Sequence, residues 1–260
     1  MKYVIIFSIL ITSFTAFAAP KSELWPYWNA SNEQNTSTVS YQDWQTLLDK
    51  YLVVKGQNSL FQYDKVSNDD RDKLKNFLSD MAQINPLDYS KAEQYAYWVN
   101  LYNSITVQLI LESYPIKSIT KLGGLFSFGP WDEKVVTING KTLTLNDIEH
   151  RILRPIWNDP RTHYAVNCAS LGCPNLQSQA FTTQNTDKLL TQAAKTFINS
   201  PKGVSEEGNE ITLSSIYKWF ASDFGGLEGV KKHLLQYKAG IEFSGKNIEY
   251  DYNWNLNELK

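Results

Sequence analysis

The sequence predicts an α+β protein, a single domain in which a central buried helix packs with other helices around a small, mainly antiparallel sheet. Residues 93–113 have the longest helical pattern and are apolar on most faces, which is typical of a buried helix. Short hairpin patterns alternate with amphipathic helical patterns, and no internal repeat or long linker divides the chain. A chain of 260 residues, 42% of them hydrophobic, is long enough to bury such a core.

The other elements follow from hydrophobic spacing, caps and turns. Helices are expected over 41–51, from the N-cap Ser67 to before Pro86, from Thr144 to near Pro155, over 187–199, from Ser214 or Ser215 to Phe220, and over 227–237. Short strands are expected over 61–66 and 163–166, and hairpins over 134–143, 203–213 and 241–250. The Asn139-Gly140 pair supplies the two positive-φ positions of a type I′ turn.

The first residues have the pattern of a signal peptide. Lys2 precedes an apolar run, and Ala16-Phe17-Ala18 fits the small-x-small cleavage pattern. We therefore expect a signal peptide over 1–18, an N-terminal lead-in and helix over 19–66, and the main domain over 67–260. The mature protein is expected to be exported, either periplasmic or secreted, with no membrane span after cleavage.

Composition narrows the classes of partner. The net charge of −2 and the lack of a basic stripe exclude nucleic-acid binding. Aromatic residues make up 13% of the chain, and such residues fill cores but also line pockets. The glycine-rich stretch over 123–129 lacks the spacing of a phosphate-binding loop, so we expect no cofactor. The expected partner is a small molecule, a peptide or a protein.

Residues 163–174 concentrate the reactive side chains. This stretch reads His-Tyr-Ala-Val-Asn-Cys-Ala-Ser-Leu-Gly-Cys-Pro and contains both cysteines of the chain. One hypothesis is a thiol enzyme in which Cys168 is the nucleophile and His150 or His163 is the base. The reaction would be hydrolysis of an amide or thioester, or acyl transfer from it.

The same hypothesis assigns supporting groups. Glu149, Asp147 or an asparagine from the central helix could orient the imidazole. Asn100 or Asn103 from the central helix, with a backbone N–H near Cys168, could stabilise an oxyanion. These asparagines belong to a polar stripe on an otherwise apolar helix, and the stripe either lines a pocket or bonds to covering loops.

Two other hypotheses need no thiol chemistry. An exported protein favours a disulfide, so Cys168 and Cys173 could form one within a non-catalytic binding module. His150, His163, Cys168 and Cys173 could instead hold zinc, although their spacing is uncommon for a zinc site. His233 lies in a late helical pattern and is expected at the surface.

Four blocks of residues resemble one family. They are Glu93-x4-Trp98-Val99-Asn100-Leu101-Tyr102-Asn103, Asp147-Ile148-Glu149-His150, His163-x3-Asn167-Cys168-x4-Cys173-Pro174 and Tyr252-Asn253-Trp254. In this order they are similar to the bacterial and plant "domain of unknown function 547" family, DUF547, from about Lys73 to the C-terminus. The resemblance implies a fold unit and a cluster of shared polar positions, and it implies no particular reaction.

Overall fold

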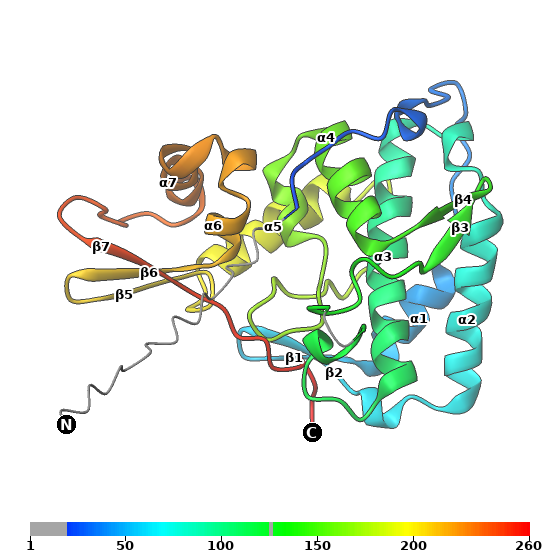
Figure 1. The fold of residues 1–260 in the computed structure, drawn as a ribbon, viewed down its shortest axis with the longest axis horizontal. Coiled ribbons are helices and arrows are strands. Elements are labelled where there is room, and N and C mark those ends of the chain that lie inside the picture. The colour runs from blue at the N-terminus through cyan, green and yellow to red at the C-terminus, as the bar shows by residue number, and fades with distance from the viewer. Residues whose placement is uncertain (1–19, 125–126) are drawn as a thin grey trace, which may run out of the picture.

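The structure is a computed structural model that describes residues 20–124 and 127–260. The expected signal peptide over 1–18 lies outside the described residues. The fold is mixed α+β, as predicted. Figure 1 shows three helices side by side at one end of the molecule, namely α1 (Gln42–Tyr51), α2 (Asn68–Gln83) and α3 (Lys91–Ser113).

Helix α3 is the buried centre of this helical layer. Ser90 caps it by accepting a hydrogen bond from the backbone N–H of Glu93. Every residue from Glu93 to Gln108 is buried, which confirms the predicted central helix. A helix that is apolar on most faces needs cover on every side, and α2, the segment over 147–153 and the loops after it supply that cover.

The strands form three small sheets. Two are antiparallel hairpins, β1 (Leu52–Lys55) with β2 (Asn58–Phe61) and β3 (Val136–Ile138) with β4 (Lys141–Leu143). The third contains β5 (Val204–Glu207), β6 (Glu210–Ser214) and β7 (Asn247–Asp251) in that order. The hairpin predicted around Asn139-Gly140 is confirmed, with both residues at positive φ.

Three strand predictions were wrong, each because other contacts hold the backbone. The closing hairpin over 241–250 does not form: Ile241 is buried in the core, and β7 instead runs parallel to β6. Residues 163–166 are not a strand, because Asp159 caps the 3-10 helix η6 (Pro160–Tyr164). Strand β2 ends at Phe61, and a 3-10 helix, η2 (Tyr63–Lys65), follows with Tyr63 hydrogen-bonded to Asn257.

The expected helix after Thr144 has an unusual geometry. Thr144 and Asp147 exchange hydrogen bonds as a capping pair, as the sequence predicted. The chain then forms a π-helical segment, η5 (Asp147–Leu153), which continues into α4 (Arg154–Trp157). The wider turn places Glu149, His150 and Arg154 on the same side of the segment, and such turns are frequent at functional sites.

The remaining helices complete the chain. They are η1 (Pro26–Asn29), η3 (Pro86–Asp88), η4 (Ile119–Lys121), α5 (Thr186–Ile198), α6 (Ile216–Trp219), η7 (Ala221–Phe224) and α7 (Gly226–Tyr237). Residues 20–124 and 127–260 include no helix that is both long and apolar enough to cross a membrane.

The buried apolar residues form two clusters. The larger surrounds α3 and includes Trp28, Trp98 and Leu153. The smaller lies among α5, α7 and the sheet of β5, β6 and β7, and includes Phe197, Leu213 and Leu234. The candidate site lies between these two clusters, because its walls come from both.

Candidate functional site

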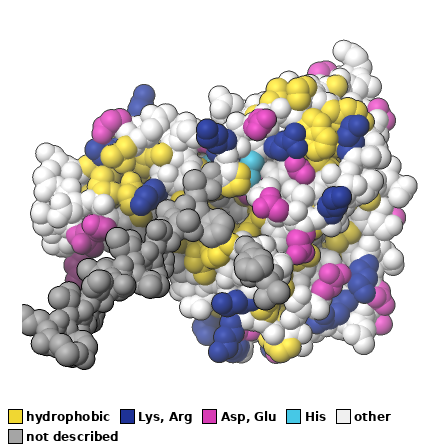
Figure 2. All heavy atoms as spheres, viewed as in Figure 1, with side chains coloured by type: hydrophobic (Ala, Val, Ile, Leu, Met, Phe, Trp, Pro, Cys, Tyr) yellow, Lys and Arg dark blue, Asp and Glu magenta, His cyan; other side chains and the backbone are white. Residues whose placement is uncertain are grey.

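A cavity of about 700 Å³ opens between the two clusters. Six aromatic side chains line it and form what we call the aromatic wall: Phe128, Trp131, Trp219, Phe220, Tyr252 and Trp254. Polar and titratable side chains also line it, namely Tyr102, Glu149, His150, His163, Cys168 and Cys173. Figure 2 shows one face of the molecule, on which basic and acidic side chains are interspersed and hydrophobic side chains lie near the centre. The cavity thus combines an apolar surface with titratable groups, as ligand pockets generally do.

The loop that holds Cys168 is fixed at several points. Asn103 Oδ1 accepts from the backbone N–H of Asn167 at 2.8 Å, and Asn167 Nδ2 donates to the carbonyl of Pro174 at 2.8 Å. The backbone N–H of Gly172 donates to Asn253 O at 2.8 Å, and a Cβ at Gly172 would meet Asn253 N at 2.6 Å. The loop therefore needs glycine at 172 to pack against the C-terminal segment.

Both cysteines are free thiols, and no disulfide joins them. Cys173 is buried, and its Sγ accepts from the backbone N–H of Cys168 at 3.0 Å. Cys168 is only partly covered, and its Sγ lies 3.0 Å from Tyr252 Oη and 3.2 Å from Ser170 Oγ.

These contacts separate the two thiols chemically. Burial raises the pKa of the Cys168 thiol, but hydrogen bonds from Cys173, Ser170 and Tyr252 outweigh burial and hold that pKa below its ordinary value. Burial and the adjacent Cys168 sulfur hold the pKa of Cys173 well above its ordinary value. Cys168 is therefore the sulfur that ionises first, and Cys173 keeps its proton.

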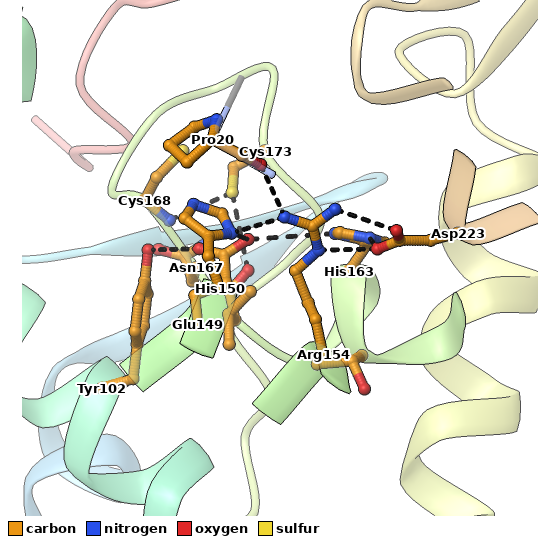
Figure 3. Close-up of polar contacts among 12 residues, drawn as sticks. Pro20, Tyr102, Glu149, His150, Arg154, His163, Asn167, Cys168, Cys173 and Asp223 are labelled. Carbon is orange, nitrogen blue, oxygen red and sulfur yellow. Dashed lines mark hydrogen bonds and ion pairs between the residues drawn. The ribbon is translucent and has the colours of Figure 1, made fainter. Parts of the chain in front are cut away.

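Glu149 lies between the two imidazoles. Its Oε2 accepts from Tyr102 Oη at 3.0 Å, and its Oε1 lies 3.9 Å from Nδ1 of both His150 and His163. His163 stacks on the ring of Phe220, with the ring centroids 4.2 Å apart. Figure 3 shows Glu149 and His150 between Cys168 on one side and His163, next to Asp223, on the other. The structure thus brings together four of the six residues predicted from the sequence.

The imidazoles are also held by an ion pair that the sequence analysis did not identify. Arg154 Nε and Nη2 donate to Asp223 at 2.6 and 2.9 Å, while Nη1 lies 2.8 Å from His150 Nδ1. Asp223 Oδ2 also lies 2.8 Å from His163 Nε2. The spacing of Arg154 four residues after His150 could have indicated the first contact. Asp223 is distant in sequence from all of them, and no local signal marks it.

The two asparagines of the central helix lie outside the cavity lining. Asn100 exchanges two hydrogen bonds with the backbone of Phe181, and Asn103 bonds the backbone of Ala165 and Asn167. Of the two explanations for the polar stripe, bonding to covering loops holds for both residues. Backbone N–H groups near the nucleophile are also occupied: that of Cys168 by Cys173, and that of Ala169 by Asn167. None of the oxyanion donors expected from the sequence therefore points freely into the cavity.

Two further expectations concern metal binding and His233. In the part of the chain that the structure describes, no group of three or more His, Cys, Asp or Glu side chains is arranged to hold a metal ion. His233 is buried rather than exposed, with its Nε2 3.0 Å from Tyr164 Oη, so the prediction of a surface position was wrong. Its ring packs between Tyr164 and Phe224, because the smaller cluster lies on that face of α7.

Comparison with known proteins adds one finding. Residues 86–198 match the family model described as "Protein of unknown function, DUF547". No curated protein and no solved structure matches the chain. The matched residues include Glu149, His150, His163, Cys168 and Cys173, whereas Asp223 and most of the aromatic wall lie after them.

Proposed function

Residues 86–198 belong to the DUF547 family, which is described only as of unknown function, and from the geometry of its site we propose that this chain is an exported thiol enzyme. Cys168 would attack the carbonyl carbon of an amide or thioester. The acyl group would then pass to water or to another acceptor, so the reaction is hydrolysis or acyl transfer.

One observation supports this proposal most strongly. The Cys168 thiol, with its pKa held below the ordinary value, opens onto a cavity that two imidazoles and a buried carboxylate also line. Structural cysteines that only fill space are buried in apolar surroundings, which raise the pKa. Cys173 fits that second description, and the contrast within one loop distinguishes the two sulfurs.

The covalent steps balance without a cofactor. The Cys168 thiolate forms a C–S bond as the C–N or C–S bond to the leaving group breaks, and the leaving group takes a proton from the site. Water or another acceptor then forms a bond to the acyl carbon, the C–S bond breaks, and the acceptor's proton returns to the site. The cycle regenerates the thiolate.

The test is acyl-enzyme formation and turnover with a small acyl thioester, such as an N-acetylcysteamine thioester. The purified mature chain should gain one acyl mass, located on Cys168 by peptide mapping, and should release free thiol over repeated turnovers. Cys168→Ser should do neither, whereas the matched variant Cys173→Ser should retain both. Release of thiol at the same rate by Cys168→Ser would contradict the proposal.

The aromatic wall supports a second candidate, a non-catalytic module that binds an apolar or aromatic small molecule. Trp219 stacks near Trp254 at 5.7 Å and packs on Tyr252 at 4.9 Å, which gives a continuous surface for ring contacts. In that case Cys168→Ser would bind the same ligands as the native chain, and no thioester would be turned over by either protein.

A further inference from the structure

The two imidazoles of the cavity have partners of opposite kind. His150 Nδ1 faces a guanidinium nitrogen of Arg154 at 2.8 Å, and His163 Nε2 faces a carboxylate oxygen of Asp223 at 2.8 Å. A guanidinium has donors only, and an ionised carboxylate has acceptors only. His150 must therefore keep a lone pair on Nδ1, and His163 must keep a proton on Nε2.

The Arg154 side chain has little freedom to break this arrangement. It is only 3% exposed, and Asp223 accepts from two of its nitrogens. Nη1 also donates to the carbonyl of Pro20 at 2.8 Å. The guanidinium plane is thus fixed by the Asp223 carboxylate and the Pro20 carbonyl, which come from different parts of the chain, and His150 receives the donor that this plane presents.

Asp223 couples the two histidines through one oxygen. Its Oδ2 accepts from Arg154 Nε at 2.6 Å and from His163 Nε2 at 2.8 Å. Burial raises the pKa of Asp223, but hydrogen bonds from His163 and Arg154 outweigh burial and hold the pKa below its ordinary value. The carboxylate therefore stays ionised and remains an acceptor for both.

From these contacts we propose that the Arg154–Asp223 ion pair is a positioning device for the two histidines. It occupies Nδ1 of His150 and Nε2 of His163, and so leaves Nε2 of His150 and Nδ1 of His163 for other partners. His150 presents an Nε2–H donor, and His163, whose Nε2 is hydrogen-bonded to Asp223, presents Nδ1. Figure 3 shows the open side of the His150 ring turned toward Cys168. His150 is then a donor to a developing oxyanion, not the base that activates Cys168.

The charge balance around His150 agrees with a neutral ring. Burial lowers the pKa of His150 to about 4; Arg154 and His163 also lower it, while Glu149 and Asp223 raise it. Asn100, Asn103 and the nearest backbone N–H groups are occupied, so none of them is available to stabilise an oxyanion in the cavity. The Nε2–H of a neutral His150 supplies that donor. This catalytic meaning rests on the proposed thiol function, whereas the protonation pattern does not.

The direct test uses nuclear magnetic resonance to locate the protons on the two imidazole rings. The full mature chain, labelled with ¹⁵N-histidine, is recorded at pH 7, with signals assigned from His150→Gln and His163→Gln. We expect a proton on Nε2 but not on Nδ1 of His150, and a proton on Nε2 of His163. A proton on Nδ1 of His150 would overturn the inference, whether or not the chain turns over thioesters.

Two arginine variants separate positioning from general stability. Arg154→Gln removes the guanidinium beside His150, while Arg161→Gln removes one that binds Asp159 through several bonds but contacts neither cavity imidazole. Arg154→Gln should give mixed tautomers at His150 and reduce thioester turnover on the order of 10²-fold, as loss of one oxyanion donor does. Arg161→Gln should change neither, and Arg154→Lys should restore part of both. Unchanged His150 tautomers in a folded Arg154→Gln protein would contradict the inference.

Discussion

The family-matched stretch over 86–198 and the segment over 204–260 contribute different things to the same cavity. The first supplies the groups that can exchange protons or form bonds, namely Glu149, His150, His163 and Cys168. The second supplies Asp223, the Tyr252 hydroxyl and most of the aromatic wall. Under the proposed function, the family-matched stretch would determine the chemistry, and the C-terminal segment would tune the reacting groups and select the ligand.

The largest effect is expected when the Cys168 thiol is removed from the family-matched stretch. Cys168→Ser should lower thioester turnover by roughly 10³-fold or more, because a hydroxyl is not ionised near neutral pH. Cys173→Ser should lower it by less than about 10-fold, because Cys173 acts only as a hydrogen-bond partner. Steady-state kinetics of the two variants measures both. Equal losses would mean that the loop, and not one sulfur, matters.

A second test compares one buried histidine from each region. Burial lowers the pKa of both His150 and His233 to about 4, against an ordinary value of 6.5. Between pH 4 and pH 6.5 these histidines therefore bind protons in the unfolded chain but not in the folded chain. The stability that they contribute is fully present above pH 6.5 and is lost as the pH falls toward 4. Each histidine contributes at most about 3 kcal/mol to that fall.

Urea unfolding from pH 7 to pH 4.5 measures this slope. His150→Gln and His233→Gln should each flatten it, and the double variant should flatten it further. If only the His233 variant flattens the slope, folding does not lower the pKa of His150, which would contradict the buried, neutral ring.

A third test removes one tuning group of the C-terminal segment. Tyr252→Phe deletes the hydroxyl 3.0 Å from Cys168 Sγ, which stabilises the thiolate. Because a hydrogen bond to a charged group is worth about 1.5–3 kcal/mol, the pKa of Cys168 should rise by roughly one to two units. Tyr250→Phe is the control, since Tyr250 is not among the cavity residues. The pH dependence of thiol alkylation shows whether only Tyr252→Phe moves the profile.

The smallest expected effect concerns the aromatic wall. Trp219→Ala should raise KM for aromatic acyl thioesters by about 5- to 10-fold while kcat changes little, because a ring contact contributes about 0.5–1.5 kcal/mol. Acetyl thioesters should show a smaller change. A loss in kcat with KM unchanged would mean that Trp219 acts together with the reacting groups. That result would contradict the division of roles between the two regions.

The elements set by local physics were predictable from the sequence. The apolar run over 93–113 predicted α3 within two residues of its bounds, and Asn139-Gly140 predicted the hairpin of β3 and β4. The grouping of Cys168 with His150, His163 and Glu149 could be proposed because their residue types suggest one chemistry. Each of these predictions needed only residue spacing or residue type.

Features that depend on long-range contacts were not predictable. The parallel pairing of β7 with β6 depends on how α6, η7 and α7 return the chain across the smaller cluster. Asp223 reaches the histidines through the same return. The choice between a pocket and loop bonding for Asn100 and Asn103 depended on backbone groups far along the chain. Hydrophobic periodicity does not contain that information.

The most direct test of the central claim is the pH dependence of iodoacetamide alkylation at each cysteine of the native mature chain, followed by mass spectrometry. The account predicts fast labelling of Cys168 with an apparent pKa below about 8.5, the ordinary value of a free cysteine, and slow labelling of Cys173. Equal labelling of the two sulfurs, or labelling of Cys168 only above that pH, would contradict it.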